Sequence, residues 1–575
     1  MEQTLHLLPN DRDLHFPDFT IVSASAGSGK THTLTLRMLQ LLLSPRVPKN
    51  SLSNIVAMTF TNNAAAEIKE RILTYLKCLY FGDEKILQEV SPLVSLDETA
   101  IRQRALEALQ TIFDQYNDFH IETIDSFLTS VFRSAAVELG FAPTYTFTLT
   151  IDDLLHDALE EYLDFATTSP EEHKFLNSLL EQIEQFHFSN SKYNWDPFDT
   201  FQKKVTDLFS KLGHYALEPL VPEISFEPVL QRTKELWNNI ERIVEASELE
   251  TNQQFPKHSK LIHSNDFDSF FTKKFDNIFN KQKNKKLQQH ADEVISQCEP
   301  FLAELKECAR VYAELRSLQT YRPYIILYQK LKPYIETQKR ESGKISLSEV
   351  TKHLGDFLRN NTLPEIYFYL GEEIAHFLID EFQDTSPLQW LNLRPLCENA
   401  LSQGGTLFIV GDTKQSIFSF RGADWRIMKQ LMERNEFPSA PRTVLSLAVN
   451  RRSTEAIVSY TQTVFHVRIP AALDSEIADA ATASGLATDT QEVYSEHRGK
   501  GRVIVRQAPA DEEQWERKEL LTAINDYTQH GFLLKHLAII TVKNDDVLKV
   551  SSWLNQEGIP FVSYSSLDIR NRKII

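Results

Sequence analysis

A short glycine-containing loop between two apolar runs constrains this chain more than any other feature. Residues 19–22 are mostly apolar, residues 34–43 form an amphipathic run at helical spacing, and the loop lies between them. This order predicts a strand, a loop and a helix whose first backbone N–H groups point into the loop. Glycines let a backbone approach a phosphate closely. The residues expected to form this phosphate-binding loop are Ala24, Ser25, Ala26, Gly27, Ser28, Gly29, Lys30 and Thr31.

Two side chains at the end of the loop carry the chemistry. Lys30 supplies a positive charge for the β- and γ-phosphates of a nucleotide, and the Thr31 hydroxyl is a ligand for Mg²⁺. The alternative is a glycine-rich turn leading into a core helix. That alternative leaves the lysine at the apex of the loop unexplained, so the pattern favours a nucleoside triphosphate site.

Bulk properties limit the class of protein. A chain of 575 residues is too long for one hydrophobic core, so two to four domains are expected. The net charge of −18 argues against a protein that coats nucleic acid without specificity, but it leaves room for a local basic groove. The sequence shows neither a signal peptide nor an apolar run of membrane-spanning length, which predicts a cytoplasmic protein without a membrane partner.

The cysteines are scattered, without the spacing of a disulfide framework, a zinc site or an iron–sulfur cluster. We expect isolated thiols in a reducing compartment. They are Cys78, Cys298, Cys308 and Cys397.

Composition divides the chain into segments. Residues 1–143 alternate strand and helix patterns, with a strand at 55–60 and helices at 64–80 and 101–116. Residues 144–343 contain almost no glycine and predict a mainly helical insertion. Its expected helices cover residues 152–165, 171–186, 199–212, 229–246 and 291–318.

Alternation of strands and helices resumes after the insertion. Residues 344–440 contain apolar strands at 377–380 and 406–410, and a third strand is expected at 443–447. Residues 471–501 suggest a linker or an irregular excursion. The rest predicts strands at 502–506, 536–542 and 560–563 and helices at 512–527 and 546–556, which resembles the opening of a second α/β layer.

Two carboxylates follow the strand at 377–380. We expect Asp380 and Glu381 to lie beside the phosphate loop of a neighbouring strand, at the carboxyl end of a parallel sheet. Asp380 is the candidate Mg²⁺ ligand, and Glu381 is the candidate group that orients and deprotonates an attacking water. A transferase needs no such base, so the pair favours hydrolysis. The alternative is a solvated acidic turn.

The segment after the strand at 406–410 combines an amide with aromatic side chains. Gln415 is placed to read a γ-phosphate, while Phe418, Phe420 and Arg421 suit a surface on which bases stack. The alternative is that both phenylalanines belong to the core. Farther on, Arg452 follows a strand end, where an arginine can stabilise transition-state charge on phosphate, although arginine pairs are usually surface charge.

A basic and aromatic stretch lies inside the insertion. It suits a nucleic-acid contact, but the same spacing fits a helix with a buried phenylalanine face and a solvated lysine face. Its members are Lys273, Lys274, Lys281, Lys283, Lys285, Lys286, Phe270, Phe271, Phe275 and Phe279.

Six segments in this order resemble the UvrD/Rep-type superfamily 1 DNA helicases. The Ala-Ser-Ala-Gly start of the phosphate loop and the large helical insertion look most similar to the RecB/AddA branch, where alanine is common at the position of Ala24. The segments are Ala24–Thr31, Thr59–Glu67, Thr123–Phe127, Asp380–Thr385, Gly411–Ser416 with Phe420–Asp424, and Asn450–Ser453.

The resemblance implies an α/β fold. Residues 1–143 and 344–440 would form a RecA-like P-loop core, residues 144–343 a large, mainly helical inserted domain, and residues 441–575 the start of a second, incomplete RecA-like core. ATP and Mg²⁺ are the implied cofactors, with Thr31 and Asp380 at the metal. The implied catalytic residues are Lys30, Glu381, Gln415 and Arg452, of which Arg452 would also contact the nucleotide. The implied DNA contacts are Thr59, Phe60, Asn62, Ser126, Phe418, Phe420 and Arg421.

The implied activity is an ATP-dependent helicase or translocase that moves 3′ to 5′ on single-stranded DNA in repair or recombination. The implied partners are single-stranded and duplex DNA, and a nuclease or a second helicase-like protein is a further possibility. The sequence reaches Ile575 before the later motifs of the family, so we expect the front part of a longer protein or a split or defective subunit. Two alternatives remain: a non-catalytic DNA-binding subunit, and a P-loop ATPase acting on a substrate other than DNA.

Overall fold

The computed structural model divides the chain into two compact units, Met1–Gly499 and Lys500–Ile575, which are described separately. It describes residues 8–134, 136, 145–148, 152–187, 203–208, 221, 223–275, 278–280, 284–360, 374–472, 475–508 and 514–563. The helix expected at 199–212 lies mostly outside these residues, as do Lys281 and Lys283. None of the helices described is long and apolar enough to cross a membrane.

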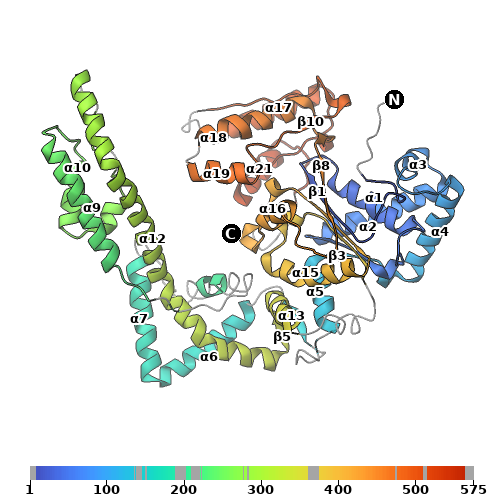
Figure 1. The fold of residues 1–575 in the computed structure, drawn as a ribbon, viewed down its shortest axis with the longest axis horizontal. Coiled ribbons are helices and arrows are strands. Elements are labelled where there is room, and N and C mark those ends of the chain that lie inside the picture. Colours follow the sequence, from blue (N-terminus) through green and yellow to red (C-terminus); the bar gives the residue numbers. More distant parts are fainter. Residues whose placement is uncertain are drawn as a thin grey trace. The chain divides into compact units, whose positions relative to one another are not determined.

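A six-stranded parallel sheet organises the first unit (Figure 1). Its strand order is β3-β2-β6-β7-β1-β8, and every neighbouring pair runs parallel. All the strands that the sequence predicts between residues 19 and 447 form in this sheet, which also contains β3, a strand that was not predicted. The six strands are β1 (Asp18–Ala24), β2 (Ile55–Thr59), β3 (His120–Thr123), β6 (His376–Ile379), β7 (Thr406–Gly411) and β8 (Arg442–Leu447).

The strand order corrects one expectation. We expected Asp380 and Glu381 to follow a strand adjacent to β1, and this was wrong because β7 lies between β6 and β1. Strand order is set by crossover connections across the whole chain, so local sequence does not encode it. Three strand ends, those of β1, β7 and β6, therefore share the edge of the sheet where the phosphate loop lies.

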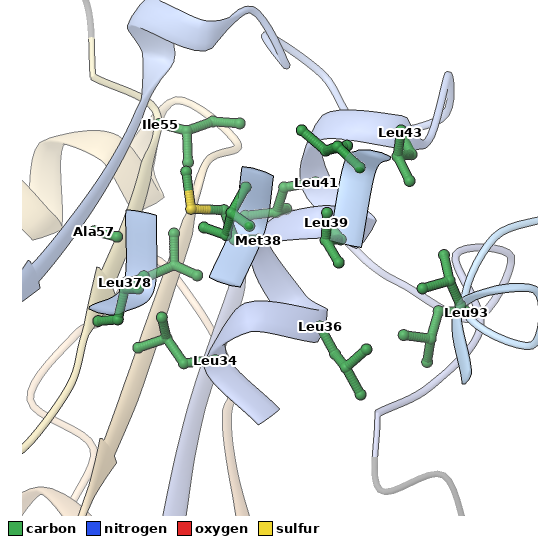
Figure 2. Packing of buried hydrophobic residues seen from close by; sticks show 14 of the residues in the cluster. Leu34, Leu36, Met38, Leu39, Leu41, Leu43, Ile55, Ala57, Leu93 and Leu378 are labelled. Carbon is green, nitrogen blue, oxygen red and sulfur yellow. The ribbon is translucent and has the colours of Figure 1, made fainter. Parts of the chain in front are cut away.

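Both faces of the sheet are buried. Successive residues of one strand point to opposite faces, so Ala57 of β2 enters one hydrophobic cluster and Met58 the other. Figure 2 shows the first cluster, in which Leu34 and Met38 of α1 point toward the sheet, near Leu378 of β6. Residues of α1 to α4 belong to this cluster, and residues of α5, α13, α15 and α16 belong to the second.

The helices of the core begin and end at residues that suit those positions. Thr61 caps α2 by accepting a hydrogen bond from Ala64 N, and Gly82 ends it in the left-handed region. Ser386 and Gln389 form a reciprocal capping box at the start of α15. The core helices are α1 (Lys30–Leu43), α2 (Asn62–Phe81), α3 (Glu84–Val90), α4 (Glu98–Asp114), α5 (Ile124–Ser134), α13 (Leu347–Asn360), α15 (Pro387–Ser402) and α16 (Trp425–Glu433).

The insertion is helical, as predicted, and one helix dominates it. Helix α12 (Lys285–Ser342) has 58 residues, and α9 packs along part of it (Figure 1). Internal prolines such as Pro323 do not end α12, because each half buries side chains in its own cluster, with Cys298 in one and Leu327 in the other. The remaining elements are α6 (Asp152–Thr168), α7 (Pro170–His187), α9 (Glu227–Ala246), α10 (Phe255–His263), α11 (Phe267–Phe271), and the paired strands β4 (Thr146–Thr148) and β5 (Lys344–Ser346).

The phenylalanines of the basic stretch are core residues. Phe270 is fully buried, its ring stacks on that of Phe275 at 5.4 Å, and both pack around Trp237 and its neighbours. Lys273 and Lys274 are exposed. Of the two interpretations of this stretch, the one with buried phenylalanines and solvated lysines agrees with the structure, but its helix does not, because α11 ends at Phe271 and residues 272–275 are not helical.

The chain beyond β8 differs from expectation in two ways. The strand at 442–447 pairs with β1, so it belongs to the first sheet although we expected the second core to start at 441. Residues 471–501 contain short elements, one of which, β10, pairs with β9. The short elements of this region are β9 (Val449–Asn450), α17 (Glu455–Thr463), α18 (Ile469–Ala472), α19 (Ser475–Ala483) and β10 (Glu492–Val493).

The second unit contains the two expected helices, α20 (Trp515–Gln529) and α21 (Asn544–Gln556). The strands expected at 502–506, 536–542 and 560–563 do not form among the described residues. A strand exists only when a neighbour completes its hydrogen bonds. These segments have apolar side chains without such a neighbour in the described chain, and Val542 is 97% exposed.

The packing of the insertion makes a testable prediction. Phe270→Ala should cost about 3–5 kcal/mol because it opens a cavity in a closed cluster, which lowers the midpoint of thermal unfolding of the inserted helices. Lys273→Ala is the matched surface control and should leave the midpoint unchanged. An unchanged midpoint in Phe270→Ala, together with weaker binding to duplex DNA in both variants, would instead make the stretch a DNA contact.

Candidate nucleotide site and aromatic surface

The phosphate loop has the backbone that its glycines allow. Gly27 has a φ of +73° and Gly29 a φ of +97°, both in the left-handed region. A Cβ on Gly27 would lie 2.7 Å from Arg452 Cβ and 2.8 Å from Asn450 Oδ1. The segment after β8 therefore lies directly against the loop, and only glycine fits between them.

Lys30 contacts two of the other predicted site residues. Its Nζ donates to Glu381 Oε2 at 2.7 Å and to Gln415 Oε1 at 3.1 Å. Thr31 Oγ1 donates to Asp380 Oδ2 at 3.1 Å. The structure thus brings together side chains from the ends of β1, β6 and β7, although the first lies about 350 residues before the other two in the chain.

The carboxyl groups beside Lys30 are crowded and poorly solvated. Burial, reinforced by the charge of Glu381, raises the pKa of Asp380 to about 6 and the pKa of Asp384 to about 7. Glu381 also has a left-handed backbone, with a φ of 51°. A non-glycine residue in this region is strained, and such strain is common at functional sites.

The donor set fits a hard divalent cation. Asp380 and the Thr31 hydroxyl offer oxygen ligands, and a positive ion would relieve the repulsion among the buried carboxyl groups. Among the described residues, no group of three or more His, Cys, Asp or Glu side chains is arranged to hold a metal by itself. Mg²⁺ typically uses one or two carboxylates and completes its shell with water and substrate phosphates, so the site matches that pattern.

Gln383 and Asp412 belong to the site but were missed by the sequence reasoning. Gln383 Nε2 donates to Glu381 Oε2 at 2.7 Å, and its Oε1 accepts from Asp412 N at 2.8 Å. Asp412 Oδ2 accepts from Gln415 Nε2 at 2.8 Å. These contacts orient two of the predicted catalytic side chains, Glu381 and Gln415. Their positions within the segments 380–385 and 411–416 were the available signal.

Arg452, the predicted arginine contact of the nucleotide, follows β9 and lies next to the phosphate loop. Its Cβ is close to Gly27, and its side chain is exposed. Asn450 fixes this turn, because its Oδ1 accepts from the N–H groups of Arg452 and Ser453 and its Nδ2 donates to Ala26 O at 3.1 Å. Asn450 is therefore a further residue of the site.

Four residues form what we call the aromatic surface: Phe60, Phe418, Phe420 and Arg421. The ring centroids of Phe60 and Phe418 are 4.5 Å apart, and those of Phe418 and Phe420 are 5.9 Å apart. The Arg421 guanidinium lies 5.5–5.9 Å from all three rings. Phe420 is 72% exposed, so it is not a core residue.

The other predicted DNA contacts divide into two groups. Asn62 and Ser126 are exposed, and Ser126 Oγ forms a 2.8 Å hydrogen bond with Thr123 Oγ1. Thr59 is fully buried, which corrects its assignment as a DNA contact. It is the last residue of β2, a strand that is buried along its whole length. The following residue, Phe60, is the first that reaches the surface.

One segment carries parts of both the nucleotide site and the aromatic surface. Gln415 contacts Lys30, and three residues later Phe418 stacks on Phe60. Between them, Ser416 Oγ donates to Gln383 O at 3.2 Å, which ties the segment to the strand end that carries Glu381. A movement of Gln415 would therefore be transmitted to Phe418 over a short stretch of backbone.

Comparison with known proteins finds a family model and curated relatives that this chain resembles. The model of the UvrD/REP helicase N-terminal domain matches residues 14–436. An ATP-dependent helicase/nuclease subunit from Anoxybacillus flavithermus is 25% identical over 497 residues, covering 78% of this chain and 39% of the relative. The RecBCD enzyme subunit RecB of Chlamydia trachomatis is 26% identical over 466 residues, covering 78% of this chain and 42% of the relative. The chain thus spans about two-fifths of the length of these curated relatives.

The raised pKa of Asp384 makes a prediction about stability without metal or nucleotide. Because its folded pKa is near 7 and its unfolded pKa near 4, the folded state binds more protons between these pH values, and stability falls as pH rises through this window. Asp384→Asn removes that penalty. The variant should therefore unfold at a higher temperature than the parent protein at pH 8, and the difference should be smaller at pH 5. An equal difference at both pH values would contradict the assignment.

Proposed function

Because the chain belongs to the UvrD/REP helicase family, we propose that it is the ATP-hydrolysing part of a DNA helicase that moves along single-stranded DNA in repair or recombination. The family match covers residues 14–436 and includes the strand ends that form the candidate site. One observation carries the proposal: Lys30 contacts both Glu381 and Gln415, and the segment of Gln415 continues into the aromatic surface.

The proposed ATP site uses residues of all three strand ends. The loop from Ala24 to Thr31 would wrap the phosphates, and Lys30 would exchange its contacts with Glu381 and Gln415 for phosphate oxygens. Glu381, released from Lys30, would orient and deprotonate the attacking water. Thr31 and Asp380 would hold Mg²⁺, which supplies charge neutralisation at the β- and γ-phosphates.

Two further residues would respond to the γ-phosphate. Gln415 would exchange its contact with Lys30 for one with the phosphate while Asp412 still holds its amide nitrogen. Arg452 begins beside Gly27 and has an exposed side chain, so it can extend over the loop and stabilise charge that develops during transfer. The hydrogen bond from Arg452 N to Asn450 Oδ1 holds the backbone of this arginine in place.

The proposed DNA contact is the aromatic surface. Every base has an aromatic face, so stacking on Phe60, Phe418 and Phe420 binds single strands without reading sequence. Asn62 and Ser126 are exposed polar residues available for the sugar–phosphate backbone. Translocation from 3′ to 5′ is proposed by analogy with the family.

The partners are proposed from the names of the relatives. One relative is a subunit of a helicase/nuclease and another is a subunit of the RecBCD enzyme. We therefore propose that this chain acts on single-stranded and duplex DNA in the cytoplasm, together with a nuclease or a second helicase-like subunit.

Hydrolysis of ATP with and without oligothymidylate tests the proposed function. Stimulation by DNA supports a DNA motor. Hydrolysis that DNA does not change would indicate an ATPase with another substrate, and DNA binding without hydrolysis would indicate a non-catalytic subunit.

The division of roles at the phosphate site predicts different defects for two variants. Lys30→Ala should remove nearly all hydrolysis and weaken ATP binding, because the phosphates lose their buried cation. Glu381→Gln keeps the shape of the side chain and loses the base, so it should bind ATP and hydrolyse it slowly. Affinity for a fluorescent ATP analogue and steady-state rates distinguish them. An equal loss of nucleotide binding in both variants would refute the division.

The aromatic surface predicts the origin of single-strand affinity. Stacking is worth about 1–3 kcal/mol per base, so Phe420→Ala should weaken binding roughly 5- to 150-fold. The dependence of affinity on salt should hardly change, because phosphate contacts determine it. Phe81→Ala is the matched control, since Phe81 is 69% exposed at the end of α2. Equal affinities for both variants would remove Phe420 from the DNA contact.

A further inference from the structure

An acidic residue far along the chain contacts the start of the phosphate loop. Asp489 Oδ2 accepts a hydrogen bond from Ser25 Oγ at 3.2 Å and forms an ion pair with Lys414 Nζ at 2.5 Å. Lys414 Nζ forms a second ion pair, with Asp412 Oδ1 at 2.6 Å. The ammonium group of Lys414 is thus held between two carboxylates, one on each side.

These contacts continue to the end of the same loop. Asp412 uses its other oxygen, Oδ2, to accept from Gln415 Nε2 at 2.8 Å. Gln415 Oε1 in turn accepts from Lys30 Nζ at 3.1 Å. A continuous series of polar contacts therefore leaves the phosphate loop at Ser25 and returns to it at Lys30.

Asp489 lies in a segment that is fixed at several points. We call residues 484–491 the strap. Thr413 Oγ1 donates to the carbonyl of Ser484 at 2.8 Å, and Asn450 Nδ2 donates to Gln491 Oε1 at 2.7 Å. His466 Nε2 lies 2.8 Å from the carbonyl oxygen of Asp489. The strap is therefore attached to the turn after β7 and to Asn450 of β9, and Asp489 attaches it to Ser25 of the phosphate loop.

The charges in this series depend on each other. Asp412 is 1% exposed, so its carboxylate needs a cation nearby. Burial acts to lower the pKa of Lys414, but Asp412 and Asp489 raise it above its ordinary value, and the lysine stays charged. A lysine held by both carboxylates has little freedom to turn toward a third anion.

We propose that Asp489 is a positioning residue for the hydrolysis of ATP. By holding Lys414 against Asp412, it keeps the amide of Gln415 oriented when negatively charged phosphates occupy the neighbouring loop. This inference rests on the proposed function. Without the Asp489 charge, Lys414 would be drawn toward the phosphates, and Asp412 would lose the cation that fixes it and, through it, Gln415.

The kinetic test compares two variants that each remove one negative charge. Asp489→Asn should lower kcat about two- to thirtyfold, the range expected for residues that act through others, and leave KM for ATP within about twofold. Glu492→Gln is the matched control, because this exposed glutamate lies three residues farther on. Both variants should unfold at the temperature of the parent chain. Equal kcat values for the two variants would overturn the inference while leaving the proposed function intact.

A variant of Lys414 tests whether Asp489 acts on Gln415 through Lys414 and Asp412. Lys414→Met should lower kcat as well, and the double variant with Asp489→Asn should lose no more than the worse single variant. Fully additive losses would show that Asp489 acts by another route.

Hydrogen exchange tests the same link without requiring turnover, so it also decides the inference if DNA fails to stimulate hydrolysis and the proposed function is wrong. In the full chain without nucleotide, Asp489→Asn should speed amide exchange both in residues 24–31 and in residues 411–416, relative to Glu492→Gln. Faster exchange confined to residues 484–491 would overturn the inference.

Discussion

The ammonium group of Lys30 connects the three strand ends on which the candidate site depends. It lies at the start of α1, is 8% exposed, and contacts Glu381 after β6 and Gln415 after β7. A buried cation requires anionic or strongly polar partners, so these contacts hold the loops together when the phosphates are absent. A triphosphate would replace those partners, and the two released side chains are the ones proposed to act on it.

The sheet makes this arrangement possible. Because β7 lies between β1 and β6, the loop after β7, which carries residues 415–421, is the central one of the three loops. Its two ends belong to different sites: Gln415 contacts Lys30 in the candidate nucleotide site, and Phe418 contacts Phe60 in the aromatic surface. Gln383 braces this loop from the side of β6. The position of one strand thus determines that nucleotide and single-stranded DNA would be sensed by the same short segment.

Local sequence was sufficient to predict those parts of the site that lie within a single short segment of the chain. The phosphate loop, the carboxylates after β6 and the run from Gln415 to Arg421 each carry a pattern whose chemistry is local. Burial at strand ends was not predictable in the same way, and Thr59 shows this, because it is fully buried although its neighbour Phe60 is only half-buried. The strand order escaped prediction because it depends on crossovers between distant segments.

Long-range polar contacts were also outside the reach of the sequence. Residues 471–501 have the composition of a linker, yet Asp489 contacts Ser25 across 464 positions of the chain. Beyond residue 500 the prediction failed in the other direction, because it expected structure that does not form. Apolar runs predicted strands there, but no neighbouring strand is present in the described chain to complete their hydrogen bonds. In both cases the partner, and not the segment, decides the structure.

We propose that the nucleotide site and the aromatic surface are energetically coupled through residues 415–418. The most direct test is the affinity of the full chain for labelled oligothymidylate, measured with and without Mg²⁺ and a non-hydrolysable ATP analogue. Coupling of ordinary size predicts a change of about 5- to 150-fold in Kd, and the affinity for the analogue must change by the same factor when DNA is added. Equal DNA affinities with and without the analogue, at saturating analogue, would contradict the account.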